Sequence, residues 1–309
     1  MFPVQYIKFT KEQLKRAQHV DLVEFLRSRG ENVYREGKHY VWDKHDSIRI
    51  MGFRWFRNSN QESGAAVKFV EHFFNLHFVD AVKLLLEDDT LPQSNCARIT
   101  NQSKSLFVPP QKNDNERRAL AYLTKSRYLD LDIVHYFMEK GMIYEDIKHN
   151  AVFVGFNSQR RPVNAFLRGT NTFHQKPFKA ITPGSDMKYP FQHIGSSDRL
   201  YVTEGAIDLL SYICLNRHED WTAHSYLSLG GLHDTALKQC LKENTHIREI
   251  VFATDNDRNS TDVHGMPINP GQDFALRFSK LYERDYITKI EPPVYKDWNQ
   301  DLKIKRMER

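Results

Sequence analysis

Acidic residues follow two apolar runs in the second half of the sequence, where strands would end. Glu204 closes the run RLYVTE, and Asp255 and Asp257 close the run REIVFATDND. Ligands bind at the carboxyl ends of strands in α/β sheets, and alternate residues of an extended segment point to the same side. We therefore expect these three carboxylates to meet at one edge of one sheet.

Carboxylates held this close raise one another's pKa and need a positive charge between them. Hard oxygen ligands suit Mg²⁺ or Mn²⁺, which bind one or two carboxylates together with substrate phosphates and keep several waters. Such a site favours phosphoryl transfer. The run KDWNQDL adds Asp297 and Asp301 as candidates for a second metal or for support, and the choice between them is open. Acids after a strand can also simply form turns.

The elements that must position these acids alternate along the chain. After Asn150 there are strand-like runs, and in the later part they alternate with helical stretches such as AIDLLSYICL, DTALKQCLKE and GQDFALRFSKLYER. This alternation is typical of a parallel sheet covered by helices. The predicted strands are AVFVGF, VNAFLRG, RLYVTEG, AHSYLSLGG, REIVFATDND and YITKIEPP.

Several of these features occur in the order found in the TOPRIM domain of bacterial primases, topoisomerases and certain nucleases. The stretch from about 199 to 301 resembles that domain in its Glu204-Gly205 pair, in Asp208, in the SLG run that ends at Gly230, and in Asp255-Asn256-Asp257. The resemblance implies a Rossmann-like parallel sheet with flanking helices. It also implies that Glu204, Asp255 and Asp257 are catalytic and bind metal, with Asp297 and Asp301 as further metal candidates. The cofactor-binding residues would be Gly205, Asp208 and Gly230.

The runs VTEGAIDLLS and SLGG look like the primase version of the domain. One departure is the run RNSTDVHGMPINP before Gly271, where primases have a glycine almost directly after Asp-x-Asp. An inserted loop at this point could gate the site or alter its substrate.

Residues 151–198 carry basic residues among aromatic and small ones: Arg160, Arg161, Arg168, Lys176 and Lys179. The region resembles the segment that precedes TOPRIM in primases, where basic residues face the acids. A nucleotidyl transferase needs positive charge to hold a triphosphate and a template backbone. We select Arg168 and Lys179 as catalytic candidates, with a solvated basic hairpin as the alternative for any single lysine.

The N-terminal region combines helical stretches with a small antiparallel sheet formed by KHYVWD, SIRIMG and FRWFRN. It resembles the zinc-binding domain of primases, but residues 1–95 contain no cysteine, and the histidines there have no zinc-site spacing. We expect no zinc. In FRWFRN, arginines alternate with aromatic residues, which either form a strip that stacks bases and contacts phosphates or build the core.

We therefore predict an α/β protein in four parts. Residues 1–95 form a small α+β domain, residues 96–115 a polar connection, residues 116–198 a helical and basic subdomain, and residues 199–309 the TOPRIM catalytic domain. Two helices are expected around ERRALAYLTKSR and LDIVHYFMEKG.

Composition sets wide bounds on function. The 309 residues carry a net charge of +5, which permits a polyanionic partner without requiring one. Three scattered cysteines, Cys96, Cys214 and Cys240, cannot form a disulfide framework. No window approaches the roughly 20 apolar residues of a membrane span. We expect a cytoplasmic protein without a membrane partner.

The primase-like N-terminus and TOPRIM C-terminus together are similar to TOPRIM proteins common on bacterial plasmids and integrative elements. This resemblance implies a primase-like nucleotidyl transferase that uses single-stranded DNA and nucleoside triphosphates in mobile-element replication or transfer. No P-loop is present, because Gly30 and Gly37-Lys38 have the wrong spacing, so a helicase or relaxase would be a separate partner. The alternatives are a TOPRIM nuclease or nickase and a non-catalytic nucleic-acid-binding module.

Overall fold

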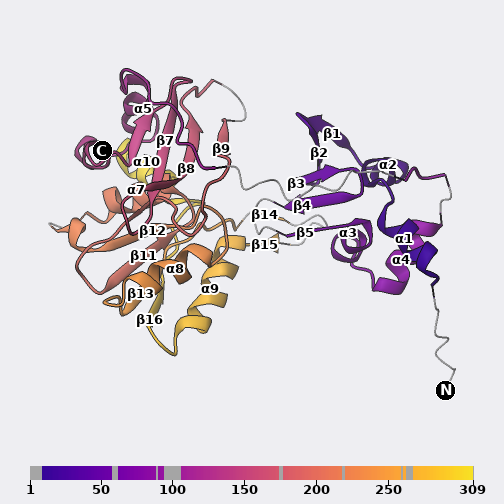
Figure 1. The fold of residues 1–309 in the computed structure, drawn as a ribbon. Helices are drawn as coiled ribbons and strands as arrows, with labels where there is room; N and C mark the ends of the chain where they lie inside the picture. The colour runs from indigo at the N-terminus through magenta and orange to yellow at the C-terminus, as the bar shows by residue number, and fades with distance from the viewer. Residues whose placement is uncertain are drawn as a thin grey trace. The chain divides into compact units, whose positions relative to one another are not determined.

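The structure is a computed structural model of residues 1–309 (Figure 1). It describes residues 9–57, 62–87, 90–93, 106–173, 177–217, 220–258, 260–261 and 267–308, without the side chain of Asp46. Cys96, Lys176, much of the predicted connection and part of the predicted insertion lie outside these residues. The chain divides into unit 1, residues 1–103, and unit 2, residues 104–309.

The described residues of unit 1 form an antiparallel sheet whose five strands follow one another in chain order, together with four short helices. Thr10 and Gln13 form a capping box at the first helix, and Asp21 caps the second, so the N-terminal helical stretch is two helices. The strands are β1 Val33–Glu36, β2 His39–Trp42, β3 His45–Met51, β4 Arg54–Arg57 and β5 Ser63–Gly64, and the helices are α1 Lys11–Gln18, α2 Leu22–Ser28, α3 Ala66–Phe73 and α4 Phe78–Leu86.

The aromatic residues of FRWFRN belong mainly to the core of unit 1. Trp55 is 2% exposed and Phe53 6%, and Trp55 packs edge-on against Phe73. The alternative of a base-stacking strip is therefore wrong for these two rings, because a buried ring offers no face to a nucleobase. The guanidinium groups of Arg54 and Arg57 lie over the rings of Phe53 and Phe73 respectively.

The first part of unit 2 has two helical segments and a four-stranded antiparallel sheet in chain order. Where one helix was predicted over ERRALAYLTKSR, the chain widens after one α-helical turn into a π-helix, in which the Arg127 N–H donates to the Tyr122 carbonyl over 3.0 Å. The elements are α5 Arg117–Ala121, π-helix η1 Tyr122–Ser126, α6 Leu131–Glu139, and strands β6 Ile143–Glu145, β7 Asn150–Phe156, β8 Pro162–Gly169 and β9 Lys179–Ile181.

The second part of unit 2 is a five-stranded sheet in the order β10-β12-β11-β13-β16, parallel except for the edge strand β10. The strands are β10 Gln192–His193, β11 Arg199–Thr203, β12 Ser225–Ser228, β13 Glu249–Phe252 and β16 Ile287–Ile290. The helices are α7 Ala206–Leu215, η2 Trp221–Ala223, α8 Thr235–Glu243, α9 Pro270–Tyr282 and α10 Trp298–Met307, and β14 Ser260–Thr261 pairs with β15 Pro267–Ile268. This arrangement confirms the predicted fold class.

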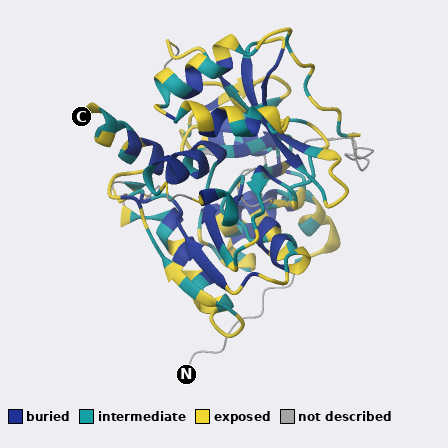
Figure 2. Ribbon diagram, turned by 90° about the vertical axis from the view of Figure 1, so that its left-hand side faces the viewer, coloured by how far each residue is buried: buried dark blue, intermediate teal, exposed yellow. Residues whose placement is uncertain are grey.

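Two hydrophobic clusters cover the faces of the parallel sheet. Figure 2 shows how far each residue of the strands and helices is buried. Helices α8 and α9 pack on one face through residues such as Leu237 and Phe274. Helices α7 and α10 pack on the other through residues such as Leu209 and Trp298, and this cluster also contains Phe153 of β7. The antiparallel sheet and the parallel sheet therefore share a core.

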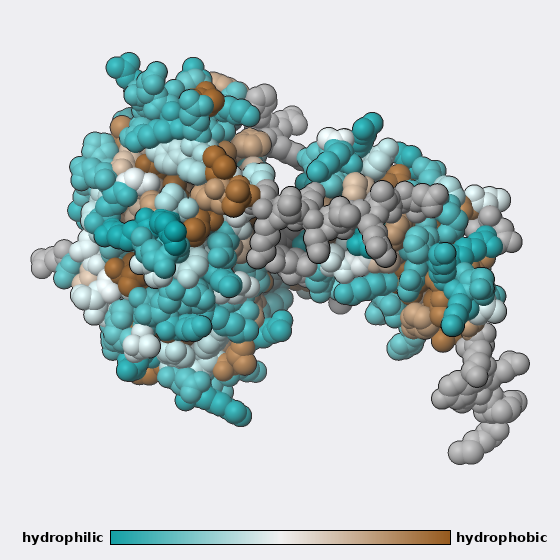
Figure 3. Space-filling model, in the orientation of Figure 1, coloured by the Kyte–Doolittle hydropathy of each residue, from teal (hydrophilic) through white to brown (hydrophobic). Residues whose placement is uncertain are grey.

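Polar residues predominate on the face of unit 2 that Figure 3 shows, with hydrophobic ones in small groups. Among the described residues, none of the helices combines the length and apolar character that crossing a membrane would take.

Candidate functional site at the acidic edge of the parallel sheet

Glu204 lies directly after β11, at the carboxyl end of a central strand. Gly205 is the N-cap of α7, and Asp208 lies in the first turn of that helix. A Cβ at Gly205 would lie 3.0 Å from a carboxylate oxygen of Asp208. On the other side, the Gly230 N–H donates to the Glu204 carbonyl over 3.0 Å, and its φ of +69° suits glycine. The structure thus places these four predicted residues together.

The Asp255-Asn256-Asp257 segment continues from β13 and is anchored by its middle residue. Asn256 is 4% exposed, and its side-chain amide donates to the Pro293 carbonyl over 2.9 Å. Its backbone N–H donates to the Lys296 carbonyl over 2.7 Å. Because the buried asparagine is fixed to the loop before α10, the two flanking aspartates are fixed as well. The sequence analysis missed this role of Asn256.

Gly271 lies against the acidic edge although residues 258–270 intervene. The Thr254 hydroxyl donates to the Gly271 carbonyl over 2.6 Å, and the Gln272 side-chain amide donates to the carbonyls of Thr254 and Asp255 over 3.0 Å each. A Cβ at Gly271 would lie 2.2 Å from the Asp255 carbonyl oxygen, so only glycine fits there. The glycine that follows Asp-x-Asp is displaced in sequence and still lies beside Asp255.

Asp297 and Asp301 have different surroundings. Asp297 caps α10 by accepting from the Gln300 N–H over 2.7 Å, and its charge helps to raise the pKa of Asp208 and of Asp255. Asp301 accepts from the Val294 and Tyr295 backbone N–H groups over 2.7 and 2.9 Å. The structure therefore brings Asp297 to the cluster and uses Asp301 to shape the preceding loop.

The acids of the cluster have strongly raised pKa values. Burial, followed by the charge of Asp257, raises the pKa of Glu204 to about 7. Burial, followed by Asp297 and Glu204, raises the pKa of Asp208 to about 7. Burial, followed by Asp208 and Glu204, raises the pKa of Asp255 to about 10. These carboxylates lack sufficient positive charge among the described residues, and a bound cation would supply it.

The donor set fits a hard divalent cation. Oδ1 of Asp255 is buried and has no hydrogen-bond partner among the described residues, so it is available as a ligand. Within the same part of the chain, no group of three or more His, Cys, Asp or Glu side chains is placed so that it could hold a metal ion by itself. Mg²⁺ is commonly bound by one or two carboxylates, with waters and substrate phosphates completing its shell. The arrangement suits a metal that is held jointly with a substrate.

Basic residues flank the acids. Arg168 of β8 and Lys179 of β9 are register partners in the antiparallel sheet, and the charges of both lower the pKa of Glu204 against the effect of burial. Neither forms an ion pair with a described carboxylate. Lys296, which the sequence analysis missed, lies 3.3 Å from an oxygen of Asp257. Its position directly before Asp297 in KDWNQDL was the available signal.

Comparison with known proteins supports two successive domains. Residues 121–197 match a family described as a protein of unknown function (DUF3991), and residues 201–302 match the Toprim-like family. An uncharacterized protein of Bacillus anthracis, pXO2-78, is 25% identical over 271 residues, which cover 81% of this chain and 77% of that protein. The predicted domain boundaries and residue roles stay predictions.

Solved structures with a similar chain path include primases. The zinc-binding and RNA polymerase domains of the Aquifex aeolicus primase are 13% identical, cover 97% of this chain and 85% of that chain, and give a TM-score of 0.36. The primase fragment of the bacteriophage T7 primase-helicase is 12% identical, covers 85% and 93%, and gives a TM-score of 0.42. The family matches confirm the predicted resemblance: residues 201–302 are a Toprim-like domain, preceded by a domain of the family DUF3991.

Proposed function

We propose that this protein is a primase-like nucleotidyl transferase that joins nucleoside triphosphates on single-stranded DNA with Mg²⁺ or Mn²⁺. The observation that carries the proposal is the unpartnered, buried Oδ1 of Asp255 within a group of acids whose pKa values are raised. Such a group favours a divalent cation, and phosphoryl transfer is the chemistry that a cation held by carboxylates and phosphates serves best.

The chain's own residues divide the work. Glu204, Asp255 and Asp257 would hold the metal, with Asp297 beside them. When bound, the metal would neutralise charge that develops on the transferred phosphoryl group. Arg168 and Lys179 would hold the triphosphate on the opposite side. Asp208 would support Glu204 and Asp255 electrostatically. Gly205, which leaves room for the Asp208 carboxylate, and Gly230 would belong to the cofactor-binding set beside Glu204.

The flanking cations favour synthesis over cleavage. A nuclease or nickase could use the same acids, but synthesis must also bind the highly charged triphosphate. The register pair Arg168 and Lys179 supplies two positive charges without carboxylate partners among the described residues. We place this activity in the cytoplasm, in the replication or transfer of a mobile element, with any helicase or relaxase as a separate protein. The relative pXO2-78 is uncharacterized, and its name supports only the link to a mobile element.

The test incubates the full chain with end-labelled single-stranded DNA, nucleoside triphosphates and Mn²⁺. Lengthened product is expected for the wild type, and Glu204→Gln and Asp255→Asn should each reduce it by at least about 10²-fold, the scale seen for loss of one electrostatic contact to a transition state. Asp301→Asn is the matched control and should retain product. Shortened DNA would establish the nuclease alternative. No change in DNA length with any nucleotide would favour a non-catalytic binding module.

A further inference from the structure

A cavity of about 180 Å³ lies between the π-helix η1, the end of β8 and helix α10. Its polar and charged lining comes from Ser126, Arg127, Asn171, Thr172 and Lys303, with Tyr122 at one side. No acidic side chain is among its lining residues. A cavity that gathers two cations and hydrogen-bonding groups has the composition of an anion site.

Arg127 is held in place by groups that leave much of its guanidinium free. Its Nε–H donates to the Tyr122 hydroxyl over 2.9 Å and an Nη1–H donates to the Asn299 side-chain carbonyl over 3.2 Å. These two bonds leave three of the five guanidinium N–H donors without a described partner. The guanidinium also lies over the Tyr122 ring, 5.2 Å from its centroid. Arg127 is thus oriented before any ligand arrives.

Lys303 supplies the second cation and is also without a carboxylate partner among the described residues. It is half-buried on α10. Burial, together with the nearby positive charge of Arg127, lowers the pKa of its ammonium group. Two like charges held near each other cost stability unless an anion lies between them. Arg127 and Lys303 are like charges held close together, as the acids at the sheet edge are, but with positive charge.

The cavity is tied to the acidic edge by shared residues. Gly169, which lines the cavity, directly follows Arg168. Asn299 binds Arg127 through its side chain, while its backbone N–H donates to Asp208 and lowers that carboxyl's pKa. The charge of Asp297 also acts on Lys303. Asn299 therefore connects Arg127 of the cavity to Asp208 of the acidic cluster.

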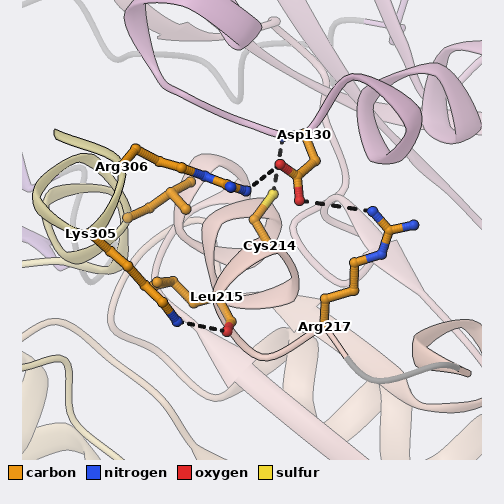
Figure 4. A pocket seen from close by; sticks show the side chains of 7 residues that line it. Asp130, Cys214, Leu215, Arg217, Lys305 and Arg306 are labelled. Carbon is orange, nitrogen blue, oxygen red and sulfur yellow. Dashed lines mark hydrogen bonds and ion pairs between the residues drawn. The ribbon is translucent and has the colours of Figure 1, made fainter. Parts of the chain in front are cut away.

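A second cavity, of about 270 Å³, is also lined by basic residues, but a carboxylate already pairs with its arginines (Figure 4). There the Asp130 carboxylate forms ion pairs with Arg306 and, over 3.9 Å, with Arg217. The Lys305 ammonium donates to the Leu215 carbonyl over 3.5 Å. Because a carboxylate already neutralises its arginines, that cavity has little reason to bind an added anion.

We propose that the cavity between Arg127 and Lys303 binds a phosphate group, either from the nucleoside triphosphate or from the single-stranded DNA backbone. The choice of nucleoside triphosphate and single-stranded DNA as the two phosphate donors to this cavity rests on the proposed function. Arginine offers a planar pair of donors that matches phosphate oxygens, and lysine adds a point charge. Ser126, Asn171 and Thr172 supply further hydrogen-bonding groups around it.

The test measures binding without turnover. Full-length protein in EDTA is titrated with ATP by calorimetry, and with a fluorescein-labelled thymidine oligonucleotide by anisotropy at several salt concentrations. The variant is Lys303→Gln, and the matched control is Lys305→Gln, which lies two positions later on α10 and lines the other cavity. Arg127→Lys is the second variant, because it keeps the charge and loses the planar fork. Thermal unfolding verifies that each variant is folded.

Lys303→Gln should weaken one of the two ligands about tenfold, as expected for loss of a hydrogen bond between charged groups. Weaker ATP binding alone identifies the triphosphate as the source. Weaker DNA binding, with a salt slope reduced by about 0.7, identifies the backbone. Unchanged binding of both ligands, an equal loss in Lys305→Gln, or a wild type that binds neither ligand overturns the inference. Asp255→Asn should retain this binding, so failure of the DNA-extension assay is separable from failure here.

Discussion

Glu145 and Asp255 of unit 2 both have buried carboxyl oxygens, but their pKa values are shifted in opposite directions. Glu145 is fully buried, and its Oε2 accepts from the Arg118 and Ala119 backbone N–H groups over 2.8 and 2.9 Å. Burial alone would raise the pKa of Glu145, but hydrogen bonds from His149 and from these backbone groups outweigh it and lower the pKa. Asp255 keeps a buried oxygen without a described partner, and its pKa is raised to about 10.

The difference separates a structural acid from a candidate functional one. The hydrogen bonds to Glu145 are made within the fold, between β6 and the start of α5, and they tie those elements together. Oδ1 of Asp255 has no hydrogen-bond partner among the described residues, and the neighbouring acids disfavour the charged form of Asp255. A group that costs stability in a well-packed domain is a candidate for a ligand site. Glu145 ends β6 and Asp255 lies shortly after β13, so both acids are near the carboxyl end of a strand and only their surroundings distinguish them.

The largest expected effect concerns metal affinity. Asp255→Asn should weaken Mn²⁺ binding by about 100-fold or more, because it removes the available anionic oxygen from the cluster. Isothermal titration calorimetry with Mn²⁺ on the full chain measures this. Glu145→Gln is the matched isosteric control and should bind Mn²⁺ as the wild type does. Equal losses of Mn²⁺ affinity in the two variants would show that Asp255 is no more a metal ligand than Glu145 is.

The next effect concerns stability, where Glu145→Gln should have the larger effect and Asp255→Asn the smaller one. Glu145→Gln should lower the free energy of unfolding by about 1–3 kcal/mol, because an amide cannot accept all the hydrogen bonds that the carboxylate accepts and leaves a buried donor unsatisfied. Asp255→Asn should leave it unchanged or raise it, because it removes a carboxyl group whose charged form the folded state disfavours. Urea denaturation without metal measures both. A destabilised Asp255→Asn would show that this carboxylate also has a structural role.

The same pair should give opposite dependences on pH. The pKa of Glu145 is lower in the folded state, so its contribution to stability is present above the usual glutamate value of about 4.3 and is lost as the pH falls below it. The pKa of Asp255 is higher in the folded state. Its contribution is present below the usual aspartate value of about 3.9 and is lost as the pH rises toward about 10.

Metal-free unfolding from pH 3 to 9 should therefore show two changes relative to the wild type. Glu145→Gln should flatten the acid side of the stability curve, and Asp255→Asn should flatten the decline on the alkaline side. Identical curves for both variants would show that the two surroundings do not differ as described.

The smallest effect separates Asp301 from Asp297. Asp301→Asn should change Mn²⁺ affinity by less than about twofold and lower the free energy of unfolding by about 1 kcal/mol, the typical net value of a lost hydrogen bond. Its oxygens bind the backbone N–H groups of Val294 and Tyr295 instead of facing the acids. The same calorimetry, with Asp297→Asn for comparison, measures this. A larger affinity loss in Asp301→Asn than in Asp297→Asn would assign the metal role to Asp301.

Patterns of apolar residues were sufficient to predict most of the strands and the parallel sheet. The run RLYVTEG is β11 with Glu204 at its end, and REIVFATDND contains β13, because buried parallel strands are short, apolar and bounded by turn residues. The widened turn of η1 was not predictable, because a π-helix depends on tertiary packing and has no distinct periodicity. The burial of Trp55 was open for the same reason, since both alternatives fit the sequence.

The site was predictable where residues follow strands and unpredictable where distant segments meet. The acids at strand ends could be placed at one edge by topology alone. Lys296 lies in the loop between β16 and α10 and contacts Asp257, and Asn256 donates to the Pro293 carbonyl of the same loop. Both contacts therefore depend on the path of that loop. Arg127 and Lys303 are 176 positions apart and line one cavity only because the two sheets share a core.

The contact between Gly271 and Asp255 also bears on how the chain can change over evolution. The short β14–β15 ladder and the Thr254 and Gln272 hydrogen bonds join the two ends of residues 258–270 beside the acidic edge. Once the ends of a loop are joined, each doubling of its length adds only about 0.6 kcal/mol of closure entropy. Closure entropy therefore sets only a small cost on added chain length between these two ends.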